Sequence, residues 1–212
     1  MLLYSETIPS PKIRNSAYRC KHKHRKPART TAHISQRFFF CHGYFNFDAP
    51  LDSGLKLADE DLTLADIIEH FDLKTCRLVT LSACETGLID FTNTSDEYIG
   101  LPNGFLLAGS TNVVSSLWAV SSVATAFLMV KFYQELQQQT NIALALNTAQ
   151  RWLRDTTVQE FQTWLGNSPL DRVWQRELRN YFDRIQAQQG ASTKPFEQPY
   201  YWAAFCTIGK GE

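Results

Sequence analysis

The stretch Arg77-Leu-Val-Thr-Leu-Ser-Ala-Cys-Glu-Thr-Gly87 decides the fold of this 212-residue chain. Residues 77–81 form an apolar and β-branched run without glycine or proline, which predicts a short buried strand. Small residues follow the run, and Gly87 ends the turn after it. Open α/β sheets bind their ligands at the carboxyl ends of their strands, so Cys84 occupies a position where function is expected. A single cysteine is nevertheless more often a small buried apolar residue than a nucleophile.

A second apolar run lies upstream and predicts a partner strand. Phe38-Phe-Phe-Cys41 is followed by His42-Gly43, which is typical of a buried strand that ends in a tight turn. Residues 62–71, between the two strands, carry helix signals: Thr63 as the N-cap, Asp66 three positions later, and apolar residues at helical spacing. Strand, helix and strand together predict a right-handed parallel βαβ unit.

The remaining segments continue the alternation of strands and helices. We expect a loop over residues 44–60 with a small edge strand at 55–57. Downstream we expect a short helix at 101–109, a strand at 112–118, helices at 123–138 (capped by Ser121 or Ser122), 142–155 and 157–187 (interrupted at 166–169), and a terminal strand at 200–208. This order is typical of an α/β domain.

Charge is distributed unevenly along the chain. Residues 1–40 hold nine of the 21 Lys and Arg residues and, in Glu6, one of the 21 acids, which leaves 12 basic and 20 acidic residues in the remainder. The acidic charge of the remainder disfavours nucleic-acid binding by that part of the chain. The sequence does not determine a partner for the basic segment at the amino terminus. For residues 1–37 the alternatives are a flexible tail, a targeting segment and a zinc site at Cys20, His22 and His24. The zinc site lacks the usual paired ligand spacing, and the tail is favoured.

Cysteine usage and hydropathy bear on where the protein acts. The five cysteines are an odd number at irregular spacing without a CxxC pair, which fits a reducing interior rather than a disulfide framework. No apolar run approaches the roughly 18–20 residues needed to span a bilayer, and no secretory signal is visible. We therefore predict a cytoplasmic protein.

His42 and Cys84 each follow a predicted strand, and one helix joins those strands. In parallel strands, about 4.8 Å apart when adjacent, both side chains would emerge at the same sheet edge. That is the requirement for Cys–His catalysis, in which the thiolate attacks and the imidazole transfers the proton. The backbone N–H groups of Gly43 and Cys84 are candidates for an oxyanion hole, worth roughly 2.7–4 kcal/mol per donor.

Several motifs resemble those of one family, in the same order. They are Cys41-His42-Gly43, Leu81-Ser-Ala-Cys-Glu-Thr-Gly87, Ser95-Asp-Glu-Tyr98 with Gly100-Leu-Pro102, Ser115-Ser-Leu-Trp118 and Tyr200-Tyr-Trp-Ala-Ala-Phe205. Together they resemble the CHAT domain, of the caspase–separase group of cysteine peptidases, from about residue 39 to 208. The resemblance implies a caspase-like three-layer α/β sandwich with a mostly parallel sheet. It also implies a cysteine endopeptidase with His42 and Cys84 as its catalytic dyad, acting without metal or cofactor.

The resemblance also implies partners. The substrate is a protein or peptide, and tetratricopeptide-repeat regions, in cis or in trans, often accompany such domains, notably in cyanobacteria. Asp96, Glu97 and Trp118 are candidates for the substrate pocket. The alternatives are solvated loop charges for the two acids and core packing for Trp118. Relatives often carry an acid after Trp118-Ala-Val120 where this chain has Ser121 and Ser122, so a preference for a basic substrate residue is not supported.

The amino-terminal region departs from the family pattern. Relatives have further strands before the His-Gly strand, and residues 1–37 show no strand pattern. We therefore predict a CHAT domain at residues 38–212 that is truncated or frameshifted at its amino terminus and lacks its first strand or strands. The rival hypothesis is a catalytically inactive remnant that acts as a protein-interaction module or has no function.

Overall fold

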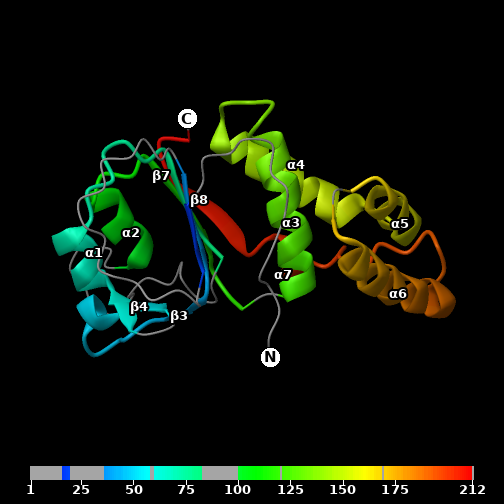
Figure 1. The fold of residues 1–212 in the computed structure, drawn as a ribbon, viewed down its shortest axis with the longest axis horizontal. Helices are drawn as coiled ribbons and strands as arrows, with labels where there is room; N and C mark the ends of the chain where they lie inside the picture. The colour runs from blue at the N-terminus through cyan, green and yellow to red at the C-terminus, as the bar shows by residue number, and fades with distance from the viewer. Residues whose placement is uncertain are drawn as a thin grey trace.

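The central element of the structure, a computed structural model, is a five-stranded sheet (Figure 1). The structure describes residues 16–19, 36–57, 60–82, 100–119, 121–168 and 170–211. In spatial order the strands are β1 (Ser16–Arg19), β2 (Gln36–Phe40), β6 (Leu78–Leu81), β7 (Asn112–Ser116) and β8 (Phe205–Gly209). The first four pair in parallel, and β8 pairs antiparallel with β7. The predicted, mostly parallel sheet is confirmed.

Helices cover both faces of this sheet. In Figure 1, α1 (Leu64–His70) and α2 (Leu101–Leu107) lie on one side, and α3 (Ser122–Glu135) and α4 (Ile142–Asp155) on the other. Alternate side chains of a strand point to opposite faces. On β6, Val79 and Leu81 accordingly join the core beneath α1 and α2, whereas Leu78 joins the core beneath α3 and α4. The predicted three-layer sandwich is confirmed.

Helix α1 begins where its sequence signals predict. The Thr63 hydroxyl accepts a hydrogen bond from the Asp66 backbone N–H at 3.1 Å, and the Asp66 carboxylate accepts one from the Thr63 N–H at 3.2 Å. This reciprocal capping box satisfies donors that the first turn of a helix leaves unpaired. Helix α1 lies between the parallel strands β2 and β6 in the sequence, so the predicted parallel strand–helix–strand unit is present.

A second, smaller sheet corrects two predictions. It consists of three short antiparallel strands in the order β3 (His42–Tyr44), β4 (Gly54–Lys56) and β5 (Asp61–Thr63). The predicted tight turn at His42-Gly43 is wrong, because the chain bends at Cys41 and both residues belong to β3. The strand predicted at 55–57 is present as β4, but its predicted position at an edge is wrong, because β4 is the central strand of the small sheet. A strand of three residues is too short for the alternation of apolar and polar residues to be recognised in the sequence.

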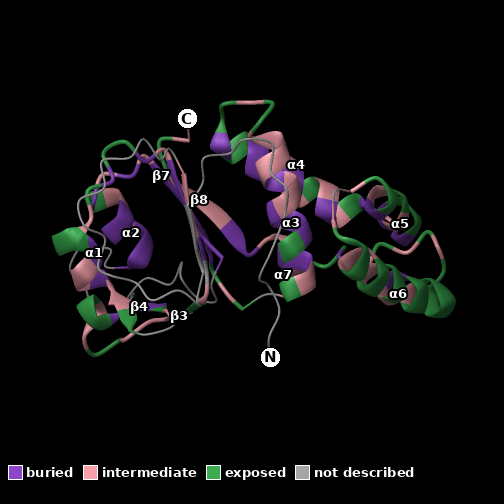
Figure 2. Cartoon of the chain, in the orientation of Figure 1, coloured by how far each residue is buried: buried purple, intermediate pink, exposed green. Residues whose placement is uncertain are grey.

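Two further helices extend the molecule beyond α4 (Figure 1). They are α5 (Val158–Gly166) and α6 (Arg172–Gln189), separated near the predicted interruption at residues 166–169. Helix α6 is exposed over most of its surface (Figure 2), and its buried residue is Phe182, whose ring stacks on Phe161 with centroids 5.0 Å apart. Aromatic packing therefore attaches this pair of helices to the core beneath α3 and α4.

The segment before the last strand forms a helix rather than a strand. Residues 199–202 make the short helix α7 (Pro199–Trp202), and only Phe205–Gly209 forms β8. The predicted strand at 200–208 is therefore wrong in its first half. The aromatic run at 200–202 has high strand propensity, but Pro199 occupies the first helical turn, where its fixed φ favours a helix.

The amino-terminal region contains a strand where the sequence predicts none. Strand β1 pairs in parallel with β2, with Ser16 opposite Arg37 and Arg19 opposite Phe40. Cys20, His22 and His24 lie outside the described residues, so the alternatives for them stay as predictions. The domain boundary at residue 37 and the truncation also stay predictions. Within the described ranges, no helix has the length and apolar character needed to cross a membrane.

Candidate active site

The carboxyl ends of three neighbouring strands are aligned in one row. Phe39 of β2 pairs with Leu81 of β6, and Leu81 pairs with Ser115 of β7. The Ser82 N–H donates to the Phe39 carbonyl at 2.8 Å, so the pairing of β2 and β6 continues one residue beyond Leu81. Segments that follow this row leave the sheet at the same edge, where α/β proteins bind their ligands.

His42 lies three residues after Phe39 and begins the small sheet. Its side chain is exposed, and the residue opposite it in β4 is Lys56. The Lys56 Nζ lies 3.0 Å from Asp61 Oδ2, an exposed ion pair that offsets the lysine charge next to His42. The structure thus places an accessible imidazole at the junction of the two sheets.

Gly43 and Tyr44 continue β3 alongside His42. Gly43 pairs with the fully buried Leu55, so its backbone is anchored to the small sheet. Burial and, next, a hydrogen bond to Asp61 raise the pKa of Tyr44 above its usual value, which keeps this phenol neutral at physiological pH. The role of the Gly43 N–H as an oxyanion donor stays a prediction.

Cys84 and the two candidate pocket acids, Asp96 and Glu97, lie outside the described residues. Strand β6 and Ser82, which precede Cys84 in the chain, are described. Cys84 follows Leu81 by three residues, and His42 follows Phe39, the register partner of Leu81, by the same number. Two peptide units separate Cys84 from Ser82, a chain length of at most about 7 Å.

Trp118 lies three residues after Ser115, the third member of the row. It is half-buried and packs against the core beneath α3 and α4, so the core-packing alternative holds for part of the side chain. Its indole N–H donates to the Tyr200 carbonyl at 3.2 Å. Leu117 and Tyr200, two exposed apolar residues, were not among the predicted site residues. Both residues belong to motifs that resemble the CHAT family, at 115–118 and 200–205, and this could have indicated them.

Two of the described cysteines, Cys76 and Cys206, lie in environments that do not favour nucleophilic chemistry. Cys76 is buried and Cys206 is half-buried. Burial raises the pKa of both thiols, and hydrogen bonding between Cys206 and Ser115 offsets this only in part. A raised pKa lowers the fraction of each thiol that is present as thiolate at a given pH. In the described part of the chain, no group of three or more His, Cys, Asp or Glu residues is placed to hold a metal ion.

The sheet order, the helices on both faces and the aligned strand ends define an α/β sandwich of the caspase-like class. The family model of the CHAT domain matches residues 34–210, and the chain belongs to this family. The match supports the caspase-like peptidase class inferred from the motifs. No curated protein matches the chain.

Proposed function

We propose that the protein is a cysteine endopeptidase in which Cys84 is the nucleophile and His42 the general acid and base. The observation that supports this most is the strand register. Phe39 and Leu81 are partners on adjacent parallel strands, and the two proposed catalytic residues follow them at equal distance along the chain. Adjacent strands lie about 4.8 Å apart, which is compatible with hydrogen-bond contact between a thiol and an imidazole that follow their ends.

The proposed reaction proceeds through an acyl-enzyme. His42 takes the proton from the Cys84 thiol, and the thiolate attacks the peptide carbonyl carbon. The carbon–nitrogen bond then breaks, and the imidazolium gives its proton to the leaving amine. Water attacks the thioester with His42 as base, which releases the acid and restores the thiol. The N–H groups of Gly43 and Cys84 would stabilise the oxyanion, at roughly 2.7–4 kcal/mol per donor.

The surroundings of His42 support this role. The imidazole is exposed to solvent, and the charge of the neighbouring Lys56 is offset by Asp61. We propose that the substrate is a protein or peptide, that tetratricopeptide-repeat regions act as partners in cis or in trans, and that the activity is cytoplasmic. We also propose Asp96 and Glu97 as residues of the substrate pocket.

Labelling with an acyloxymethyl-ketone peptide library tests the proposal. Wild type is expected to be labelled at Cys84, Cys84→Ala to remain unlabelled, and His42→Ala to react at least about 100-fold more slowly, because proton transfer contributes that much or more. Cys206→Ala is the matched control and should be labelled like wild type. Equal labelling of wild type and Cys84→Ala would remove Cys84 as the nucleophile. A folded protein that no member labels would favour the interaction-module alternative.

A further inference from the structure

The loop that joins β3 to β4 exposes large apolar side chains. Residues 45–53 form this loop, the β3–β4 loop, and the side chains of Phe47 and Leu51 are 60% and 51% exposed. The rings of Phe45 and Phe47 pack edge to face, with their centroids 4.8 Å apart. A single exposed apolar side chain is ordinary, but an aromatic pair and a leucine on one short loop call for a binding explanation.

Hydrogen bonds fix the backbone of the β3–β4 loop. The Asn46 N–H donates to the Ser53 hydroxyl at 2.9 Å, which joins the two ends of the loop. The Asn46 side-chain carbonyl accepts from the N–H groups of Asp48 and Ala49, each at 3.1 Å. Ser53 is fully buried, and its carbonyl accepts from the Leu64 N–H at 2.7 Å. The loop is therefore ordered before any partner arrives, which lowers the entropic cost of binding.

Acidic side chains accompany the apolar ones on this loop. Each of the two exposed apolar residues is followed in the sequence by an exposed aspartate, Asp48 or Asp52. Within the described ranges, no hydrogen bond or ion pair engages either carboxylate. Residues 41–55 contain no Lys or Arg. The loop therefore presents apolar side chains together with carboxylates that have no cationic partner in the described part of the chain.

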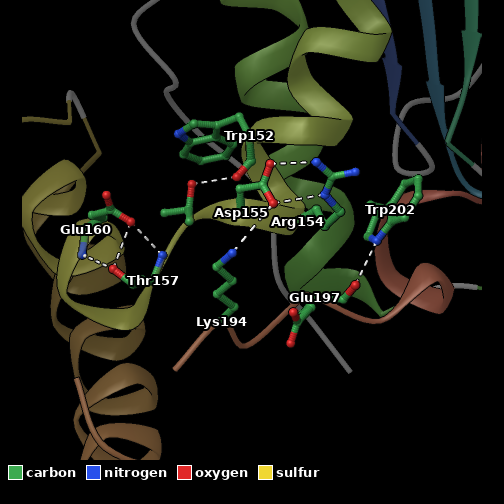
Figure 3. Close-up of polar contacts among 9 residues, drawn as sticks. Trp152, Arg154, Asp155, Thr157, Glu160, Lys194, Glu197 and Trp202 are labelled. Atoms are coloured by element: carbon green, nitrogen blue, oxygen red, sulfur yellow. Dashed lines mark hydrogen bonds and ion pairs between the residues drawn. The ribbon is translucent and has the colours of Figure 1, made fainter. Parts of the chain in front are cut away.

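An aspartate on α4 shows the opposite arrangement. Asp155 accepts two hydrogen bonds from the Arg154 guanidinium, at 2.9 and 2.7 Å, and lies 3.7 Å from the Lys194 Nζ (Figure 3). Because these cations already offset its charge, Asp155 offers little attraction to a basic partner. A carboxylate without such a cation keeps its attraction for one. Charge complementarity therefore favours a positively charged partner for the β3–β4 loop.

We infer that the β3–β4 loop is a docking site for a polypeptide segment that carries apolar side chains flanked by Lys or Arg. The Phe45–Phe47 pair supplies an aromatic anchor, a type of side chain that is enriched at protein interfaces, and the two carboxylates attract the flanking basic groups. The same carboxylates would be repelled by an anionic membrane surface, so a polypeptide is the favoured partner. Docking at this loop requires neither His42 nor Cys84, and so does not depend on the proposed peptidase reaction.

Fluorescence anisotropy with three pools of fluorescein-labelled dodecapeptides tests the docking site. The first pool combines Leu or Phe with Lys or Arg, the second has Glu in place of the basic residues, and the third has Ser in place of the apolar ones. The full chain with Cys84→Ala is used throughout, so that no peptide is cleaved. The first pool should bind at least roughly tenfold more tightly than either of the others.

Variants of the loop assign the binding to its side chains. Phe47→Ala should weaken binding of the first pool at least roughly tenfold, whereas Phe47→Tyr should remain within about threefold of the parent chain. Asp48→Asn combined with Asp52→Asn should weaken binding at least about threefold at low salt and reduce its salt dependence. Leu107→Ala is the matched control, because Leu107 is 74% exposed on α2, a helix without charged residues, and it should bind like the parent chain.

Cooperative thermal unfolding verifies that each variant is folded. Because Phe47 is 60% exposed, its replacement should leave the core intact. Equal binding of the three pools, or binding that survives Phe47→Ala, would overturn the docking site. Equal losses with Phe47→Ala and Leu107→Ala would overturn it as well, because the peptides would then bind exposed apolar side chains without regard to charge.

Discussion

The thiols of this chain lie in different environments, and their reactivity should follow from those environments. Cys76 is buried, and its Sγ donates a hydrogen bond to the Leu78 carbonyl at 3.4 Å. Cys206 is half-buried in β8 and contacts Ser115. Burial raises the pKa of both thiols above the usual value, so less of each is thiolate at a given pH. Neither environment activates a nucleophile.

We therefore predict that Cys76 and Cys206 are protected from alkylation in the native protein. At pH 8, iodoacetamide should modify both at least about tenfold more slowly than in the guanidinium-denatured chain, and Cys76 should be the more protected of the two. Peptide mapping by mass spectrometry gives the rate for each cysteine, and the denatured chain serves as its own control. Native rates equal to the denatured rates would show that the described burial does not govern these thiols.

At the scale of elements, the capping box of α1 links a short sequence signal to the position of the candidate site. Helix α1 connects the small sheet, which contains His42, to the segment leading into β6, which precedes Cys84. It has only seven residues, so its terminal hydrogen bonds form a large share of its own stabilisation. Loss of the cap should therefore be measurable in the stability of the protein.

Thr63→Ala should lower the free energy of unfolding by about 1 kcal/mol, because the Asp66 N–H loses its side-chain acceptor. Urea denaturation followed by circular dichroism measures the change. Thr140→Ala is the matched control: Thr140 is exposed, precedes α4 and loses the same side-chain atoms, and it should change stability by less than about 0.5 kcal/mol. Equal effects of the two substitutions would contradict the role given to the capping box.

The sequence predicts the longer elements because their periods and caps are local. The strand at 77–81, the Thr63 cap and the helices at 123–138 and 142–155 all correspond to described elements. Prediction fails where the decisive contact is distant in sequence. The three-residue strands of the small sheet exist only because they pair with one another, and the aromatic run in α7 is held partly by Gln150.

At the scale of the whole molecule, the sheet separates two cores and aligns the ends of its strands. The core beneath α1 and α2 contains Phe39, Leu81 and Val113, and the core beneath α3 and α4 contains Leu78 and Val114. Strands β2, β6 and β7 contribute to both cores, so a slip of one residue in register would move their apolar side chains to the wrong faces. The register that places apolar side chains in the two cores therefore also determines which strand ends lie side by side at the candidate site.

This dependence explains how much of the site the sequence could predict. A shared sheet edge for His42 and Cys84 follows from two strand predictions and the rule for parallel units. The register of Phe39 with Leu81 and Ser115 depends on pairing across the sheet and became visible only in the structure. The exposure of Leu117 and Tyr200 likewise became visible only in the structure.

The most direct measurement for the proposed dyad is the pH dependence of Cys84 alkylation in wild type and His42→Ala, with His70→Ala as the control histidine on α1. A neighbouring imidazolium favours the thiolate, so we predict that His42→Ala moves the alkylation profile to higher pH and lowers the rate at pH 7 at least roughly tenfold. His70→Ala should leave the profile unchanged. Superimposable profiles for wild type and His42→Ala would contradict the Cys84–His42 dyad.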